Sequence, residues 1–178
     1  MASSILEMSR LESGEKGLNL SMHDITETVR RIIISFEQKL SEKNIDLELD
    51  IPDRINITAD HDAMFQAIYN LVDNALKFVD TNGKIIIYMS EKNSSLQFNI
   101  INSGGEIAKE DIKFIFDRFY KGDASRTRTG GGSGLGLYIV KTIINRHGGD
   151  VFVKSENNTT EFCFKIPLKA DNTQENKQ

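Results

Sequence analysis

Apolar and polar residues recur along the chain with two periods, and these periods predict its helices and strands. Helical spacing marks residues 25–40, 60–79 and the stretch after residue 136 to about 146, and a short helix is predicted near 109–116. Alternation with a period of two predicts strands at 45–51, 55–58, 83–91, 96–102, 150–156 and 160–167. Two consecutive hairpins, at 84–102 and 150–168, argue against a doubly wound parallel sheet. The pattern therefore predicts an α/β sandwich, in which helices cover one face of a mixed, mostly antiparallel sheet.

The chain divides into three predicted segments. Residues 1–20 are typical of the last turns of a helix followed by a linker, because Ser13-Gly14 stops the apolar helical pattern. Residues 21–168 form one domain, as the chain length of 178 residues suggests. The polar residues 169–178 are expected to be a disordered tail.

Composition and charge narrow the function classes. A net charge of −4 and a pI near 5.4 argue against nucleic acid as a partner. The single cysteine excludes an internal disulfide and suggests a reducing compartment. Since no apolar run approaches the length of about 20 residues that a membrane helix needs, we expect no direct membrane contact.

The predicted helix at 60–79 carries polar residues that are unusual for a helix surface. Asn70, Asn74 and Lys77 cluster on one side, although asparagine is a mediocre helix former. The opposite, core face is predicted to comprise Met64, Ile68, Leu71, Val72, Ala75 and Val79. A plain solvated face would explain the polar residues. A metal and phosphate face would also explain them, because amide oxygens suit Mg²⁺ and a lysine suits phosphate.

Five glycines fall within residues 130–136, directly before the last predicted helix. Neither a P-loop nor a dinucleotide fingerprint fits, because Leu137 stands where the first needs lysine and the second needs glycine. Gly134 and Gly136 would still let backbone N–H groups approach an anion at a helix start. A second pair, Gly104-Gly105, follows a strand and by itself suggests a tight turn.

Four motifs follow one another along the chain: NLVDNALKF, NSGGEI, FIFDRFYKGD and GGGSGLGLYIVKTIINRHGG. Together they resemble the nucleotide-binding boxes of the sensor histidine kinase catalytic domain. This domain is of the Bergerat type, shared with gyrase, the ninety-kilodalton heat-shock chaperone and mismatch-repair ATPases. The resemblance covers residues 60–168. It implies ATP and Mg²⁺ as cofactors and a flexible ATP lid.

The resemblance also implies roles for individual residues. Asn74 would ligate Mg²⁺, and Asn70 would lie beside the metal and the triphosphate. Lys77 and Arg118 would approach the phosphates and would form the catalytic set with Asn70. The other implied nucleotide-binding residues are Phe78 and Asn102 near the adenine, Gly104, Phe119, Tyr120, Gly132, Ser133, Gly134, Leu135 and Gly136.

Two positions depart from the family pattern. Asn102 stands where an aspartate usually accepts a hydrogen bond from the adenine amino group, and the lost charge is expected to weaken binding by about 1 kcal/mol. Glu106 stands where a second glycine is common, so it would be strained if that position needed a positive φ. Both departures keep open an alternative function, a degenerate nucleotide-binding module that regulates by docking without catalysis.

The expected chemistry is phosphoryl transfer rather than hydrolysis. In the related ATPases a glutamate one turn before the metal-binding asparagine activates water, and here that position is Asn70, whose amide is no base. The implied acceptor is a histidine of a dimerisation domain, and none of the three histidines (His23, His61 and His147) matches its sequence context.

The resemblance therefore implies a catalytic-domain fragment, monomeric on its own. It would be the cytoplasmic domain of a membrane-anchored sensor kinase. Its implied partners are its own dimerisation domain and a response regulator.

Overall fold

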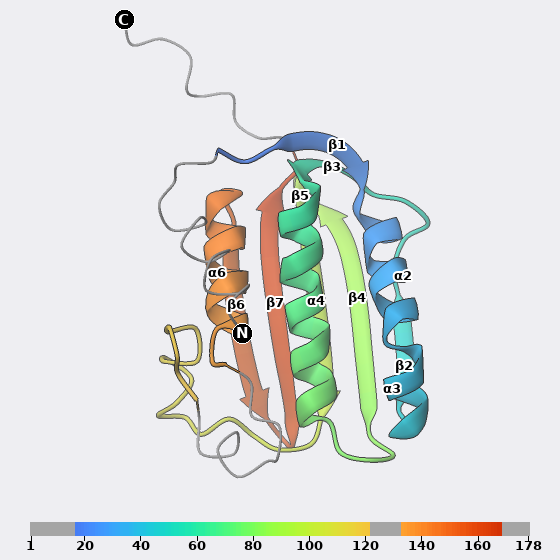
Figure 1. The fold of residues 1–178 in the computed structure, drawn as a ribbon, viewed down its shortest axis with the longest axis vertical. Coiled ribbons are helices and arrows are strands. Elements are labelled where there is room, and N and C mark those ends of the chain that lie inside the picture. The colour runs from blue at the N-terminus through green and yellow to red at the C-terminus, as the bar shows by residue number, and fades with distance from the viewer. Residues whose placement is uncertain (1–16, 122–132, 169–178) are drawn as a thin grey trace, which may run out of the picture.

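The computed structural model describes residues 17–121 and 133–168, and its centre is a five-stranded sheet (Figure 1). The strand order is β2-β4-β5-β7-β6. The strands are β2 (Asp46–Asp50), β4 (Lys84–Lys92), β5 (Ser95–Ser103), β6 (Asp150–Glu156) and β7 (Thr159–Pro167). β2 runs parallel to β4, and the other neighbouring pairs are antiparallel. The predicted mixed, mostly antiparallel sheet is confirmed.

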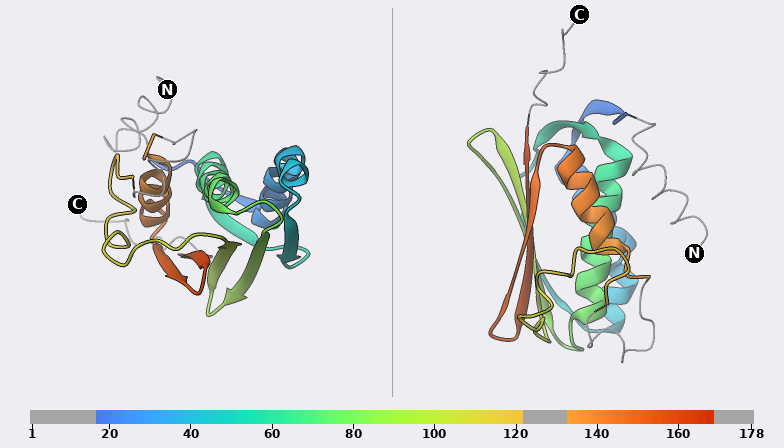
Figure 2. Two further views of the ribbon diagram at one scale, coloured as in Figure 1. Left: turned by 90° about the horizontal axis from the view of Figure 1, so that it is seen from below. Right: turned by 90° about the vertical axis from the view of Figure 1, so that its left-hand side faces the viewer.

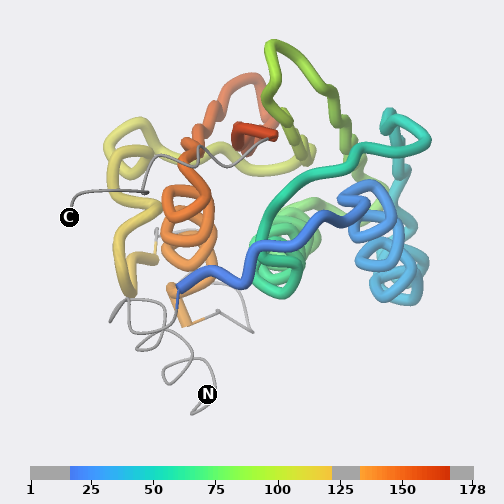
Figure 3. Tube along the Cα trace, turned by 90° about the horizontal axis from the view of Figure 1, so that it is seen from above, coloured from blue at the N-terminus to red at the C-terminus, as the bar shows by residue number. Residues whose placement is uncertain are grey.

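Helices cover one face of this sheet, and no described helix covers the other (Figure 2). They are α2 (Ile25–Ser35), α3 (Glu37–Glu42), α4 (His61–Phe78) and α6 (Gly136–Arg146). A separate two-stranded ribbon of β1 (Leu20–Asp24) and β3 (Asn56–Asp60) lies across one end of the helices (Figure 3). The layered α/β architecture is therefore the predicted one.

Side-chain caps fix where the first two long helices begin. The Asp24 carboxylate accepts hydrogen bonds from the first turn of α2, including the Thr26 N–H at 3.0 Å. Asp60 caps α4 by accepting from the Ala63 N–H at 3.1 Å. The single helix predicted at 25–40 is wrong, because the chain leaves helical geometry at Phe36 and continues as α3. The break accompanies burial of the Phe36 ring, whose centroid lies 4.8 Å from that of Tyr69.

The core lies between the helices and the sheet. All six residues of the predicted core face of α4 are buried. They face a sheet surface that includes Phe98, Phe162 and Phe164, and the rings of Phe98 and Phe164 stack with centroids 5.0 Å apart. This match follows from the helical period, which places residues three and four apart on one face.

The predicted short helix at 109–116 is absent. That stretch forms successive turns, in which the Asp111 and Ile112 N–H groups both donate to the Ala108 carbonyl. Ile115 is buried and Phe116 packs on Phe162, so the turns are held by tertiary contacts rather than by a regular helix.

Several predictions fall outside the described residues. These are the helix within residues 1–16, the glycines at 130–132 and the tail at 169–178, so the segment boundaries at 20 and 168 stay predictions. Among the helices of the described ranges, none combines the length and apolarity of a membrane span.

Candidate functional site

The polar residues of α4 lie beside the start of α6. The Asn70 side chain is half-buried, and its amide nitrogen donates a long hydrogen bond of 3.5 Å to the Gly136 carbonyl. Asn74 is half-buried too, and its amide makes no hydrogen bond to any described residue. Lys77 forms an ion pair with Asp73 one turn earlier. The structure thus brings Asn70 and the glycine segment together, although they are far apart in the sequence.

The base of the glycine segment is closed by backbone contacts. The Phe119 N–H donates to the Gly134 carbonyl at 3.0 Å. Gly134 has a φ of +72°, and a Cβ there would lie 2.9 Å from both the Phe119 carbonyl carbon and the Tyr120 oxygen. Only glycine fits this position without moving the backbone. At Gly136, by contrast, a Cβ would meet nothing closer than 3.9 Å, so its own surroundings leave room for a side chain.

The N-terminus of α6 has the properties of an anion site. Its N-cap residue, Leu135, makes no side-chain capping bond, and the first turn holds no acidic residue. The Ser133 hydroxyl accepts from the Leu135 N–H at 3.3 Å. Uncapped N–H groups and the partial positive charge of the helix start favour a negatively charged group here.

The loop after β5 is held from two sides. Gly104 has a φ of +92°, and a Cβ on it would lie 2.8 Å from the Asp80 carboxylate oxygen at the end of α4. The Gly104 N–H also donates to the Asn158 carbonyl at 3.0 Å, which ties the loop to the β6–β7 hairpin. Asn102, the second-last residue of β5, is 1% exposed, and its amide nitrogen donates to the Ser103 carbonyl at 3.2 Å.

The backbone of Glu106 is not strained, although glycine is common at this position in the family. The positive φ angles of this loop lie at Gly104 and Gly105, not at Glu106. The Glu106 carboxylate instead accepts from the Asn158 N–H at 2.7 Å. Asn158 was not predicted to contact this loop. The Asn157-Asn158 pair between two alternating runs is nevertheless a signal for a hairpin turn, and both residues have a positive φ.

Three of the remaining predicted site residues, Phe78, Phe119 and Tyr120, are aromatic. Phe119 is 55% exposed, and the Arg118 guanidinium lies 4.9 Å from the centroid of its ring. Tyr120 is half-buried and its hydroxyl donates to the Asp111 carboxylate. Phe78, at the end of α4, is half-buried. The nucleotide contacts of these residues stay predictions.

The donor groups near α4 fit Mg²⁺ better than a softer metal. Within the described ranges, no group of three or more His, Cys, Asp or Glu side chains could hold a metal ion. A metal at Asn70 and Asn74 would therefore have neutral amide oxygens as its protein ligands. Such a set suits Mg²⁺, which keeps several waters and takes substrate phosphates as further ligands.

Comparison with known proteins identifies the family. Residues 59–170 match the family of histidine kinase-, DNA gyrase B- and HSP90-like ATPases. This chain belongs to that family. The match runs from the last two residues of β3 through all of the candidate site to the final hairpin.

Individual relatives of this ATPase-family chain are sensor kinases. It is 32% identical over 175 residues to the sensor histidine kinase WalK of Bacillus subtilis (strain 168), covering 96% of this chain and 28% of WalK. It is 33% identical over 168 residues to the sensor protein SrrB of Staphylococcus aureus (strain MRSA252), covering 94% of this chain and 29% of SrrB. The chain thus spans less than a third of the curated relatives it matches.

Solved structures agree with this family assignment. The catalytic domain of histidine kinase ThkA, 31% identical, superposes with a TM-score of 0.77 over 85% of this chain and 97% of that one. ThkA in complex with the response regulator TrrA is 28% identical, with a TM-score of 0.76 over 96% of this chain and 49% of that one. The fold is that of histidine kinase catalytic domains.

Proposed function

We propose that this chain binds Mg-ATP and that, in the intact protein, it transfers the γ-phosphoryl group to a histidine of a dimerisation domain. The proposal rests on two features that lie next to each other in the fold. The half-buried amides of Asn70 and Asn74 lie on the helix that faces the uncapped start of α6, and Asn70 contacts Gly136 there. Amide oxygens and a helix start without a side-chain cap together suit a metal–triphosphate group.

Each predicted residue then has a physical role. Asn74 and Asn70 would hold Mg²⁺, which when bound supplies positive charge to the phosphates. Lys77 would exchange its partner Asp73 for a phosphate oxygen, since a partly exposed ion pair is weak. Arg118, on the exposed surface beside Phe119, would approach the terminal phosphate. Catalysis would consist of positioning and charge stabilisation.

The family's adenine pocket corresponds to the loop after β5. Asn102 would accept from the adenine amino group through its amide oxygen, because its amide nitrogen donates to the Ser103 carbonyl. Gly104 would keep that loop close to the end of α4, where a side chain has no room. The lid would comprise Phe119, Tyr120 and the glycine segment with Gly132, Ser133, Gly134, Leu135 and Gly136.

Transfer to a histidine is favoured over hydrolysis because the position of the water-activating base is Asn70, an amide. His147 is a poor acceptor, since its ring is half-buried and both nitrogens are hydrogen-bonded, Nδ1 to the Ile143 carbonyl at 2.7 Å and Nε2 to the Asp60 N–H at 3.0 Å. We therefore infer that the acceptor histidine belongs to a dimerisation domain. We further infer that the intact protein is a membrane-anchored kinase. A response regulator would then receive the phosphoryl group, since the similar kinase ThkA forms a complex with the response regulator TrrA.

Calorimetry tests the site directly. Asn74→Ala is expected to abolish Mg²⁺-dependent ATP binding and to leave the unfolding transition in place, because Asn74 bonds to no described residue. Asn145→Ala, on the exposed surface of α6, is the matched control and should bind ATP normally. Unchanged affinity in Asn74→Ala would show that the metal lies elsewhere.

Labelled ATP tests the reaction. The chain is mixed with a matching dimerisation domain, and acid-labile phosphohistidine is expected on that domain. Confirmed ATP binding without any phosphohistidine would favour the alternative, a regulatory nucleotide-binding module. Steady phosphate release from the isolated chain would instead indicate an ATPase.

A further inference from the structure

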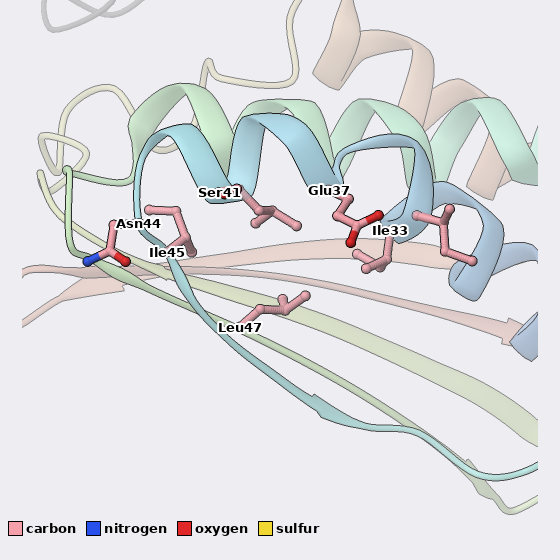
Figure 4. A pocket seen from close by; sticks show the side chains of 8 residues that line it. Ile33, Glu37, Ser41, Asn44, Ile45 and Leu47 are labelled. Atoms are coloured by element: carbon pink, nitrogen blue, oxygen red, sulfur yellow. The ribbon is translucent and has the colours of Figure 1, made fainter.

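An apolar groove of about 460 Å³ runs between the helix pair α2–α3 and the strand β2 (Figure 4). Most of its lining is apolar, with the polar side chains of three residues at its margins. The apolar members include Ile33, Leu40, Ile45 and Leu47, and the polar ones are Glu37, Ser41 and Asn44. Ile34 extends the apolar surface and is 69% exposed. The elements that line the groove, α2, α3 and the start of β2, lie on the opposite side of α4 from α6 (Figure 1). The groove is therefore separate from the candidate nucleotide site.

The strand that borders the groove has an open edge. β2 is the end strand of the sheet and pairs with β4 alone among the described strands. The Asp46 N–H points toward β4, where it donates to the Gly83 carbonyl at 2.9 Å. Because backbone direction alternates along a strand, the peptide groups of Leu47 and Leu49 face the open edge. Such an edge is a template for pairing with another extended chain.

The two faces of β2 differ in chemistry. Leu47 lines the groove on the helix side, and Asp46, Glu48 and Asp50 alternate with it toward the uncovered face of the sheet. Lys84 contacts two of these carboxylates, with its ammonium 2.7 Å from the Glu48 oxygen and 3.6 Å from the Asp46 oxygen. Lys84 is the only described cation within ion-pair distance of these three carboxylates, so the described row keeps a net negative charge.

We propose that the β2 edge and the groove bind an extended segment of a partner protein in which apolar residues alternate with lysine or arginine. The segment would add a strand to the sheet through the Leu47 and Leu49 peptide groups. Its apolar side chains would enter the groove, and its cations would lie opposite the acidic row. A second copy of this chain is disfavoured as the occupant, because pairing two β2 edges would place the acidic rows against each other.

A labelled heptapeptide in which valine alternates with lysine is the probe, and fluorescence anisotropy with the full chain measures its binding. Glu48→Lys is expected to weaken binding about fivefold, with the difference shrinking at high salt. Glu156→Lys on β6 is the matched control, which changes the net charge equally at the other edge of the sheet. The two glutamates are 55% and 54% exposed and are paired with lysines at 2.7 Å and 2.5 Å.

Two further measurements separate strand addition from simple charge attraction. In the saturated complex the amide protons of Leu47 and Leu49 should exchange more slowly than in the free chain. A peptide N-methylated at alternate residues on its pairing edge should lose binding, and Asn74→Ala should not affect binding of the parent peptide.

The proposal is overturned by any of four results. These are no detectable binding, equal weakening by Glu48→Lys and Glu156→Lys, full affinity of the N-methylated peptide, or unchanged exchange at Leu47 and Leu49.

Discussion

Two glycines of the same segment, Gly134 and Gly136, are expected to respond oppositely to an added methyl group. In Gly134→Ala the new Cβ would lie 2.9 Å from the backbone of Phe119 and Tyr120, and neither atom can rotate away. The φ of +72° adds about 1–2 kcal/mol for an L-residue, and the overlap adds about 1–3 kcal/mol. Gly134→Ala should therefore lose about 2–5 kcal/mol locally, either as global stability or as opening of the segment base.

Gly136→Ala has no such conflict, because the nearest atom to its Cβ would be the Asn70 Cγ at 3.9 Å. Alanine at a helix position is more favourable than glycine by about 0.5–1 kcal/mol, so the fold should be as stable or slightly more stable. If triphosphate lies against the start of α6, however, the methyl group would crowd it. Overpacking by one methyl group costs about 1–3 kcal/mol, which weakens the ATP affinity by about 5- to 150-fold.

The assays are urea unfolding for stability and calorimetry with Mg-ATP for affinity, on both variants and the parent chain. Gly136→Ala should separate the two readouts, with stability kept and affinity lost. Gly134→Ala should lower both, since the closed base is part of the folded structure. Gly136→Ala with full ATP affinity would contradict the placement of the phosphates at α6. Gly134→Ala with parental stability and affinity would refute the steric argument.

Three further outcomes are expected. Gly104→Ala should lose stability and ATP affinity, because its Cβ would lie 2.8 Å from the Asp80 carboxylate. At Gly105 a Cβ would have nothing within 4 Å, so Gly105→Ala should lose only the strain energy of its positive φ, about 1–2 kcal/mol of unfolding free energy in urea. Burial lowers the pKa of His147, so the unfolded chain binds the proton more readily than the folded chain. The free energy of unfolding should therefore fall as the pH drops below about 6.5. His147→Gln should reduce this pH dependence in urea titrations. Lys43→Met should cost about 1–3 kcal/mol by urea unfolding, since the ammonium donates to two carbonyls at the end of α4, the shorter bond being 2.6 Å.

The end of α6 shows why a local rule can be overridden. Sequence position alone favours a cation at His147, because a helix C-terminus carries partial negative charge. In the fold, burial lowers the pKa of the ring, and its Nε2 must stay unprotonated to accept the Asp60 N–H. The two residues are 87 positions apart, so no local pattern reports this contact.

The break at Phe36 and the turns at 109–116 have a similar explanation. Both segments carry helical spacing, which is necessary for a helix that buries one face but does not fix its continuity. Phe36 and Ile115 are buried in the observed geometry, so their burial does not require a continuous helix. The long helix α4 was predictable because its cap, its period and its core face all favour the same structure.

The sequence by itself determined the core face of α4, the pairing of the two hairpins and the order of the four motifs. These depend on the helix and strand periods and on neighbours along the chain. Only the tertiary structure distinguished Gly134, which touches the Phe119 backbone, from Gly136, which has room for a methyl group. It alone showed that β2 has an open edge beside an apolar groove. Space around an atom and the pairing of a strand depend on residues distant in the sequence, and these meet only in the folded chain.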